Sequence, residues 1–122
     1  IDCRLTTFDP QGAWLVGSLM LALIRSKEAE MRARINAVGG LTMGADPVAL
    51  AIAMSSFAAH DPVPLRAFTV RKAPKAHGQT KLIEGNFSKG DTVVVLDDVV
   101  TRGESTIAAI NAVVKEGGIK RG

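Results

Sequence analysis

Residues 93–105 read VVVLDDVVTRGES, and this stretch decides how the rest of the chain is interpreted. Four apolar residues lead into the two acids Asp97 and Asp98, which are followed by two valines and a short turn rich in glycine and hydroxyl groups. A short apolar run bounded by turn residues predicts a buried strand. A helical pattern over residues 105–115 starts directly after the turn, so the acids are expected at the C-terminal end of a strand that leads into a helix.

The chemistry of this stretch suits a ligand that carries both hydroxyl groups and a phosphate. Two adjacent carboxylates at a buried strand end repel each other and lose hydration, so ribose hydroxyls, a metal ion or backbone donors must offset that cost. Gly103 lets backbone N–H groups approach an anion, and the helix that follows adds its positive N-terminal end. The alternative is that one acid only caps the turn. A sugar phosphate is the simplest ligand that uses both features.

Composition limits the classes of protein that the chain can represent. Its 122 residues fit one domain, and an apolar fraction of 47% is ample for a packed core. The net charge of +3 is compatible with anionic small molecules and with nucleic acid. However, an aromatic content of 4% with no tyrosine gives no platform for base stacking. We therefore expect a small-molecule ligand and no nucleic acid.

Two further features concern the location of the protein. The most apolar run, residues 13–24, has about half the length needed to span a bilayer, so we expect a core helix and no membrane. Cys3 is the only cysteine and cannot form an internal disulfide, which makes a reducing cytoplasm the simplest location. The chain starts within a predicted strand and ends just after a predicted helix, and we expect it to be truncated at both ends.

Hydrophobic periodicity predicts strands that alternate with helices, which favours a mainly parallel sheet with helices on its faces. The expected strands are residues 1–8, 35–38, 66–71 and 92–96. The expected helices are residues 10 to about 25, 47 to about 59 and 105–115, with Asp9 as the cap of the first. Residues 27–34 are expected to form a polar connection that is helical in part. Trp14 is expected in the core or in a dimer interface.

Two more segments carry candidate binding groups. Residues 72–89 lack clear periodicity, and so long an irregular segment in a compact domain is typical of a mobile functional loop. The stretch RKAPKAHG, residues 71–78, leads into this segment and holds four potential cations that would suit a leaving pyrophosphate, although a solvated charged face is the alternative. The glycine-rich loop GGLTMGADP, residues 39–47, connects a strand to a helix and suits an anion, although a tight turn alone would also explain it.

These three segments carry a family resemblance. VVVLDDVVTRGES is similar to the phosphoribosyl-pyrophosphate (PRPP) signature of type I phosphoribosyltransferases, in which the acids hold the ribose hydroxyls and the loop holds the 5-phosphate. RKAPKAHG followed by LIEG resembles the catalytic loop of the orotate phosphoribosyltransferases, with Ala73 in place of a glutamate. GGLTMGADP looks like the pyrophosphate loop of one branch of these enzymes, some members of which have a lysine where Gly44 stands.

The resemblance implies the roles of individual residues. The catalytic residues would be Arg71, Lys75, His77, Asp97 and Asp98. The PRPP-binding residues would be Arg71, Lys72, Lys75, His77, Asp97, Asp98, Val99, Val100, Thr101, Arg102, Gly103, Glu104 and Ser105. Thr101 would also contact orotate, and the pyrophosphate loop would consist of Thr42, Met43 and Gly44. Arg102 and Glu104 stand where the family commonly has small residues.

The resemblance also implies the fold and the reaction. We expect a three-layer type I phosphoribosyltransferase fold over residues 1–122, as one partial domain with a mobile loop at about 72–89. The expected activity is that of a pentosyltransferase, a glycosyltransferase that converts orotate and PRPP into orotidine 5-phosphate and pyrophosphate in UMP biosynthesis. Mg²⁺ would bridge substrate oxygens with no direct protein ligand assigned. A homodimer is implied, because Arg71, Lys75 and His77 would act in trans and Lys72 in cis.

Three alternatives remain open from the sequence. The first is a phosphoribosyltransferase of the same fold that acts on a purine base, against which the Arg-Lys-x-x-Lys-x-His-Gly loop argues. The second is a non-catalytic regulator that binds PRPP and DNA, against which the intact loop cations argue. The third is a structural fragment whose site has been lost, which Glu104 and the expected truncation favour.

Overall fold

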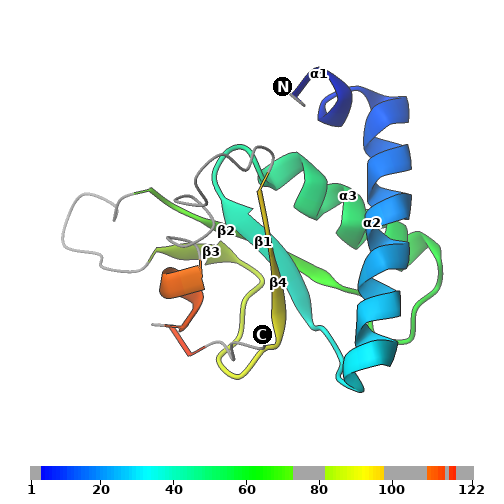
Figure 1. The fold of residues 1–122 in the computed structure, drawn as a ribbon. Coiled ribbons are helices and arrows are strands. Elements are labelled where there is room, and N and C mark those ends of the chain that lie inside the picture. Colours follow the sequence, from blue (N-terminus) through cyan, green and yellow to red (C-terminus); the bar gives the residue numbers. More distant parts are fainter. Residues whose placement is uncertain (1–3, 73–81, 98–109, 115, 118–122) are drawn as a thin grey trace.

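A computed structural model describes residues 4–72, 82–97, 110–114 and 116–117 (Figure 1). The helices are α1 (Arg4–Thr7), α2 (Pro10–Met31) and α3 (Asp46–Ala58), and the strands are β1 (Ala37–Leu41), β2 (Arg66–Val70), β3 (Ile83–Gly85) and β4 (Val93–Leu96). Residues 110–114 are also helical, which agrees with the helix expected over 105–115, and the other residues of that helix lie outside the described ones. Residues 116–117 form a turn.

The four strands form one sheet in the order β3-β2-β1-β4. Strands β2, β1 and β4 run parallel, and β3 is antiparallel to β2. One face packs on α2 and α3 through a core that includes Ile24, Val38 and Ile52. The other face packs on the helical residues 110–114 through Ala112 and Val113. The predicted mainly parallel sheet with helices on both faces is therefore confirmed.

The central strand β1 lies further along the chain than the sequence pattern indicated. The prediction ended the strand at Val38, but Gly39 and Gly40 lie inside it. A Cβ atom on Gly39 would collide with the carbonyl oxygen of Phe68, and one on Gly40 with that of Leu96. The two glycines are thus required by the close approach of the neighbouring backbones, and they do not mark the start of a loop.

Helix α2 begins as predicted and ends later. Asp9 caps it, because a carboxylate oxygen of Asp9 accepts a hydrogen bond of 2.8 Å from the amide of Gly12. The helix then continues to Met31, so the segment 27–34 is helical in part, as expected. The i,i+3 ion pair between Lys27 and Glu30 is compatible with helical geometry. Arg32 ends the helix in the left-handed conformation, and its amide donates to the carbonyl of Glu28.

The apolar run in α2 is less buried than a core helix requires. Within α2, Gly17 and Ile24 are buried, but large apolar side chains on the same helix are exposed: Trp14, Leu15, Leu19 and Leu23. The expectation of a core helix was therefore wrong for much of the helix surface. Of the two positions expected for Trp14, the core was wrong because the residue is 60% exposed, and the dimer interface stays a prediction. No helix in the described part of the chain is long and apolar enough to cross a membrane.

The predicted N-terminal strand was also wrong over its described part. Residues 4–7 form the short helix α1, which lies beside the start of α2 and away from the sheet (Figure 1). A strand needs a neighbour for its backbone hydrogen bonds, and no strand in the described part of the chain reaches this position. The amide of Asp9 instead donates to the carbonyl of Thr6, so the turn is closed locally.

The remaining elements agree with the prediction with one addition. Helix α3 and strands β2 and β4 lie within one or two residues of the expected bounds. Strand β3 lies inside the segment 72–89 for which no periodicity was found. Strand β3 has three residues and is too short to produce an alternating pattern in the sequence. It is a strand because its backbone pairs with β2.

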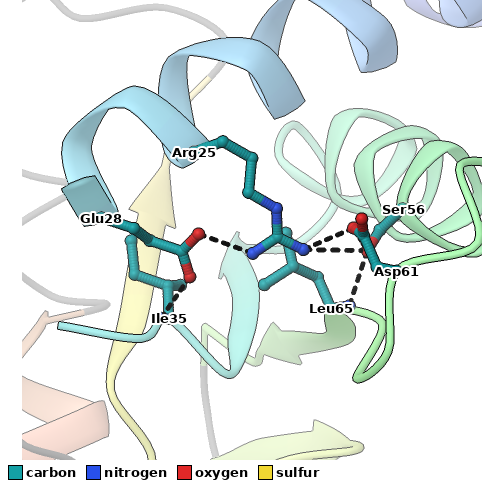
Figure 2. Close-up of polar contacts among 6 residues, drawn as sticks. All are labelled: Arg25, Glu28, Ile35, Ser56, Asp61 and Leu65. Atoms are coloured by element: carbon teal, nitrogen blue, oxygen red, sulfur yellow. Dashed lines mark hydrogen bonds and ion pairs between the residues drawn. The ribbon is translucent and has the colours of Figure 1, made fainter.

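A polar network fixes the edge of the sheet where the parallel strands begin (Figure 2). The guanidinium of Arg25 donates to Glu28 at 2.6 Å and to Asp61 at 2.5 Å. The hydroxyl of Ser56 donates to Asp61 at 2.6 Å and accepts from the amide of Leu65 at 3.0 Å. Arg25 therefore joins the last turns of α2 to the end of α3 and to the segment that leads into β2.

Replacing Ser56 by alanine should destabilise the fold. The variant leaves the buried amide of Leu65 without its acceptor, and an unpaired buried donor costs about 1–3 kcal/mol. Denaturant unfolding measures this loss. The matched control is Ser26→Ala at an exposed position of α2. Equal stability of the two variants would contradict the role assigned to Ser56.

The network should also make stability depend on pH. Hydrogen bonds from Ser56 and then from Arg25 lower the pKa of Asp61 below its ordinary value of 3.8. A carboxyl group with a lowered folded-state pKa stabilises the fold above its unfolded pKa, and this contribution is lost as the pH falls through the folded pKa. Wild type should therefore exceed Asp61→Asn in stability near neutral pH, with a gap that narrows below about pH 4. Unfolding curves across this range test it, and a constant gap would disprove the linkage.

Candidate functional site

Three predicted binding segments meet at one edge of the sheet. In the parallel ladder Leu41 is paired with Val70, and Gly40 with Leu96. The next residues along the three strands are Thr42, Arg71 and Asp97. The C-terminal ends of parallel strands share one edge, which is where open α/β sheets bind ligands. The structure therefore brings the described parts of the pyrophosphate loop, the cationic segment and the acidic signature together.

The loop after β1 is fixed at both ends. The amide of Thr42 donates to the carbonyl of Val70 at 2.8 Å, and the amide of Asp46 donates to the carbonyl of Met43 at 3.2 Å. The peptide bond between Thr42 and Met43 is cis. No acceptor in the described part of the chain pairs with the amides of Met43 and Gly44. Adjacent backbone amides of this kind suit an anion.

Asp46 holds this loop through a side-chain contact that sequence reasoning missed. The hydroxyl of Thr42 donates to one carboxylate oxygen of Asp46 at 2.7 Å. A hydroxyl has a single proton, so towards a ligand Thr42 presents its lone pairs and not a donor. The other carboxylate oxygen of Asp46 is buried and has no partner among the described residues. The motif GADP contained this residue, but its spacing alone did not indicate the contact with Thr42.

The cationic segment begins directly after β2. Arg71 is half-buried, and its Nη1 atom lies 3.2 Å from Oε1 of Glu84 on β3. The amide of Arg71 donates to the carbonyl of Leu82 at 2.8 Å, which extends the β2–β3 pairing by one residue. Lys72 is exposed. Lys75 and His77 lie outside the described residues.

The acidic segment is described as far as Asp97. This residue follows β4 and is partly buried, and its position at the strand end agrees with the prediction. The predicted PRPP-binding residues that come after it lie outside the described residues: Asp98, Val99, Val100, Thr101, Arg102, Gly103, Glu104 and Ser105.

A cavity of about 260 Å³ adjoins this edge on the α3 side of the sheet. Its polar lining comes from Asp46, Thr69 and Glu84. The hydroxyl of Thr69 is buried without a partner among the described residues, as is Nε of Arg71 nearby in the chain. Buried polar groups are normally paired, so their grouping at one end of the sheet marks the region as unusual.

Sequence comparison relates the chain to enzymes of one activity. No family model matches the chain. The orotate phosphoribosyltransferase of Aquifex aeolicus (strain VF5) is 44% identical over 112 residues, which are 92% of this chain and 57% of that protein. The orotate phosphoribosyltransferase of Mycobacterium tuberculosis (strain H37Rv) is 41% identical over 119 residues, which are 97% of this chain and 60% of that protein. The chain thus spans somewhat more than half the length of these curated relatives.

Solved structures agree with the sequence comparison. The crystal structure of Mycobacterium tuberculosis H37Rv orotate phosphoribosyltransferase in complex with PRPP matches with a TM-score of 0.74 and 39% identity, over 97% of this chain and 61% of that one. The adenine phosphoribosyltransferase of Leishmania tarentolae matches with a TM-score of 0.62 at 16% identity, which shows the fold alone. The chain therefore has the fold of the type I phosphoribosyltransferases, and it is similar to orotate phosphoribosyltransferases over more than nine-tenths of its length.

Proposed function

We propose that the protein that carries this chain is an orotate phosphoribosyltransferase. It transfers the phosphoribosyl group of PRPP to orotate, and it releases orotidine 5-phosphate and pyrophosphate in the synthesis of UMP. The observation that carries the proposal is that the pyrophosphate loop, the cationic segment and the acidic signature all begin at the C-terminal edge of the sheet, at Thr42, Arg71 and Asp97. The 41–44% identity to relatives named for this activity supports the same substrate pair.

In this proposal each strand end acts on a different part of PRPP. Asp97 and Asp98 hold the ribose hydroxyls, and residues 101–105 hold the 5-phosphate. The loop of Thr42, Met43 and Gly44 receives the pyrophosphate through the backbone amides of Met43 and Gly44, and Val99 and Val100 line the ribose site. When the bond from C1 to pyrophosphate breaks and the bond from C1 to the orotate nitrogen forms, positive charge develops on the ribose. Catalysis then consists mainly of positioning and electrostatic stabilisation.

The cationic loop completes the site in a homodimer. Arg71, Lys75 and His77 act on the pyrophosphate of the neighbouring subunit, while Lys72 acts within its own. The outer surface of α2 and α3 supports a partner, because large apolar side chains are exposed there: Trp14, Leu15, Leu19, Leu23, Leu50, Met54 and Phe57. Extended apolar patches of this kind mark interaction surfaces. The mobile loop expected at about 72–89 excludes β3 in this proposal, because Ile83–Gly85 is paired with β2, and the loop belongs to the same single domain.

Mg²⁺ fits the arrangement as a cofactor bound mainly by substrate. Asp97 supplies a carboxylate at the strand end, next to the loop that would hold pyrophosphate. Mg²⁺ is usually bound through one or two carboxylates together with substrate phosphates and water. Its chemistry here is to neutralise the charge of the pyrophosphate. The single cysteine, Cys3, and the soluble substrates favour a cytoplasmic protein that binds neither nucleic acid nor membrane.

Activity should depend on both substrates. In the protein that carries this chain, the absorbance of orotate should fall only when PRPP and Mg²⁺ are present, with release of one pyrophosphate per orotate. Adenine, hypoxanthine and uracil serve as competing bases. Turnover of adenine or hypoxanthine without orotate would assign the protein to the purine enzymes. PRPP binding with no turnover of any base would support the non-catalytic regulator.

Replacing Asp97 by asparagine should weaken PRPP binding by about 10- to 100-fold, because hydrogen bonds to a charged group contribute about 1.5–3 kcal/mol. Calorimetric titration with PRPP measures the affinity without a base. The matched control is Asp61→Asn, which makes the same change at the opposite edge of the sheet. Unchanged affinity in Asp97→Asn would remove this residue from the ribose site.

A further inference from the structure

Arg71 is bound by a carboxylate of its own hairpin. Strands β2 and β3 are antiparallel, with Thr69 opposite Glu84 and Val70 opposite Ile83. Side chains alternate along a strand, so Thr69, Glu84 and Arg71 belong to one face of this pair, and Val70 and Ile83 to the other. Glu84 is therefore a diagonal neighbour of Arg71, and an ion pair of 3.2 Å between Nη1 and Oε1 joins them across the two strands.

The main chain beneath this ion pair is fixed by a second carboxylate. The amide of Arg71 donates to the carbonyl of Leu82. The amides of Leu82 and Ile83 both donate to Oε2 of Glu116, at 3.0 Å each. The backbone on both sides of the pair is thus held in place. What remains free to vary is the long side chain of Arg71, and Glu84 restricts it.

The burial of the guanidinium limits how a ligand reaches it. Nε of Arg71 is buried and has no partner among the described residues, and Nη1 is bound by Glu84. A ligand can therefore approach from the Nη2 side. Since the side chains of Arg71 and Glu84 are 35% and 40% exposed, their ion pair contributes little to global stability. Its effect is on the position of the guanidinium.

We propose that Glu84 is a positioning residue that orients Arg71 towards the pyrophosphate of the PRPP bound in the neighbouring subunit, an inference that rests on the proposed function for the role of Arg71. Without Glu84 the arginine must lose its rotamer freedom when the ligand binds, which weakens binding. The opposing physical effect is that a carboxylate offsets part of the guanidinium charge and competes with the ligand. When Glu84 is removed, loss of positioning lowers the affinity for PRPP and loss of competition raises it, so the two effects can be separated.

The test uses steady-state kinetics of Glu84→Ala, Glu84→Gln, Arg71→Ala and the double variant Arg71→Ala/Glu84→Ala. Glu84→Ala should raise the KM for PRPP about threefold to tenfold, with a smaller change in kcat. Glu84→Gln keeps an acceptor oxygen and should give an intermediate KM. In the Arg71→Ala background, loss of Glu84 should have no further effect. Glu30→Ala, at an exposed position of α2, is the control.

Two results would overturn the inference. If both Glu84 variants lower the KM for PRPP, Glu84 competes with the ligand and does not position Arg71. If Glu84→Ala has the same effect with and without Arg71, the effect does not act through Arg71. An unchanged melting temperature in Glu84→Ala, together with the raised KM, excludes a merely structural cause.

A binding experiment separates this inference from the proposed function. Titration of the same variants with inorganic pyrophosphate needs neither orotate nor turnover. If pyrophosphate binding weakens in Glu84→Ala only when Arg71 is present, the positioning role stands even where orotate is not a substrate. If orotate is turned over but the Glu84 variants have the same pyrophosphate affinity and the same KM for PRPP as wild type, the positioning role fails and the proposed function stands.

Discussion

The close packing of β1 between its two neighbours is the constraint on which the site depends. Side chains at Gly39 and Gly40 would collide with the backbones of β2 and β4, so glycine at both positions allows the three parallel strands to form one continuous ladder. The register of that ladder places the ends of β1, β2 and β4 level with one another. A slip of one residue would turn every side chain to the opposite face, and the binding segments would no longer meet.

Polar side chains are paired with one another at the edge where the parallel strands begin, but several are unpaired among the described residues at the opposite edge. Where the parallel strands begin, polar side chains satisfy one another: Glu28 accepts from the amide of Ile35, and Asn36 accepts from the amide of Thr92. At the other end, buried side-chain atoms without a partner among the described residues belong to Asp46, Thr69, Arg71 and Glu116. Unpaired buried groups cost free energy, so their concentration where β2 ends suits a region that binds a polar ligand.

The sequence predicted the parts of the fold that depend on local pattern. The apolar run of β4 and the Asp9 cap of α2 have strong local signals, and both were confirmed. Two elements depended on distant neighbours and were wrong. Gly39 and Gly40 resemble a loop until the backbones beside them are known. Residues 4–7 resemble a strand until it is clear that none of the described strands lies beside them. The wrong prediction of burial for α2 also arose because local pattern was the only guide. Apolar residues indicate that a helix face is buried, but they do not show which part of the protein or which partner covers it.

The candidate site shows the same limit at the level of single residues. Motifs indicated the residues that would meet the ligand, because phosphate and ribose require particular groups at particular spacings. They did not indicate the residues that hold those groups, because such contacts arise from pairing across strands and turns. Asp46 lies four residues after Thr42, and Glu84 lies thirteen residues after Arg71 and reaches it only through the short strand β3. Supporting residues of this kind follow from the register of the sheet, so they can be recognised only once that register is known.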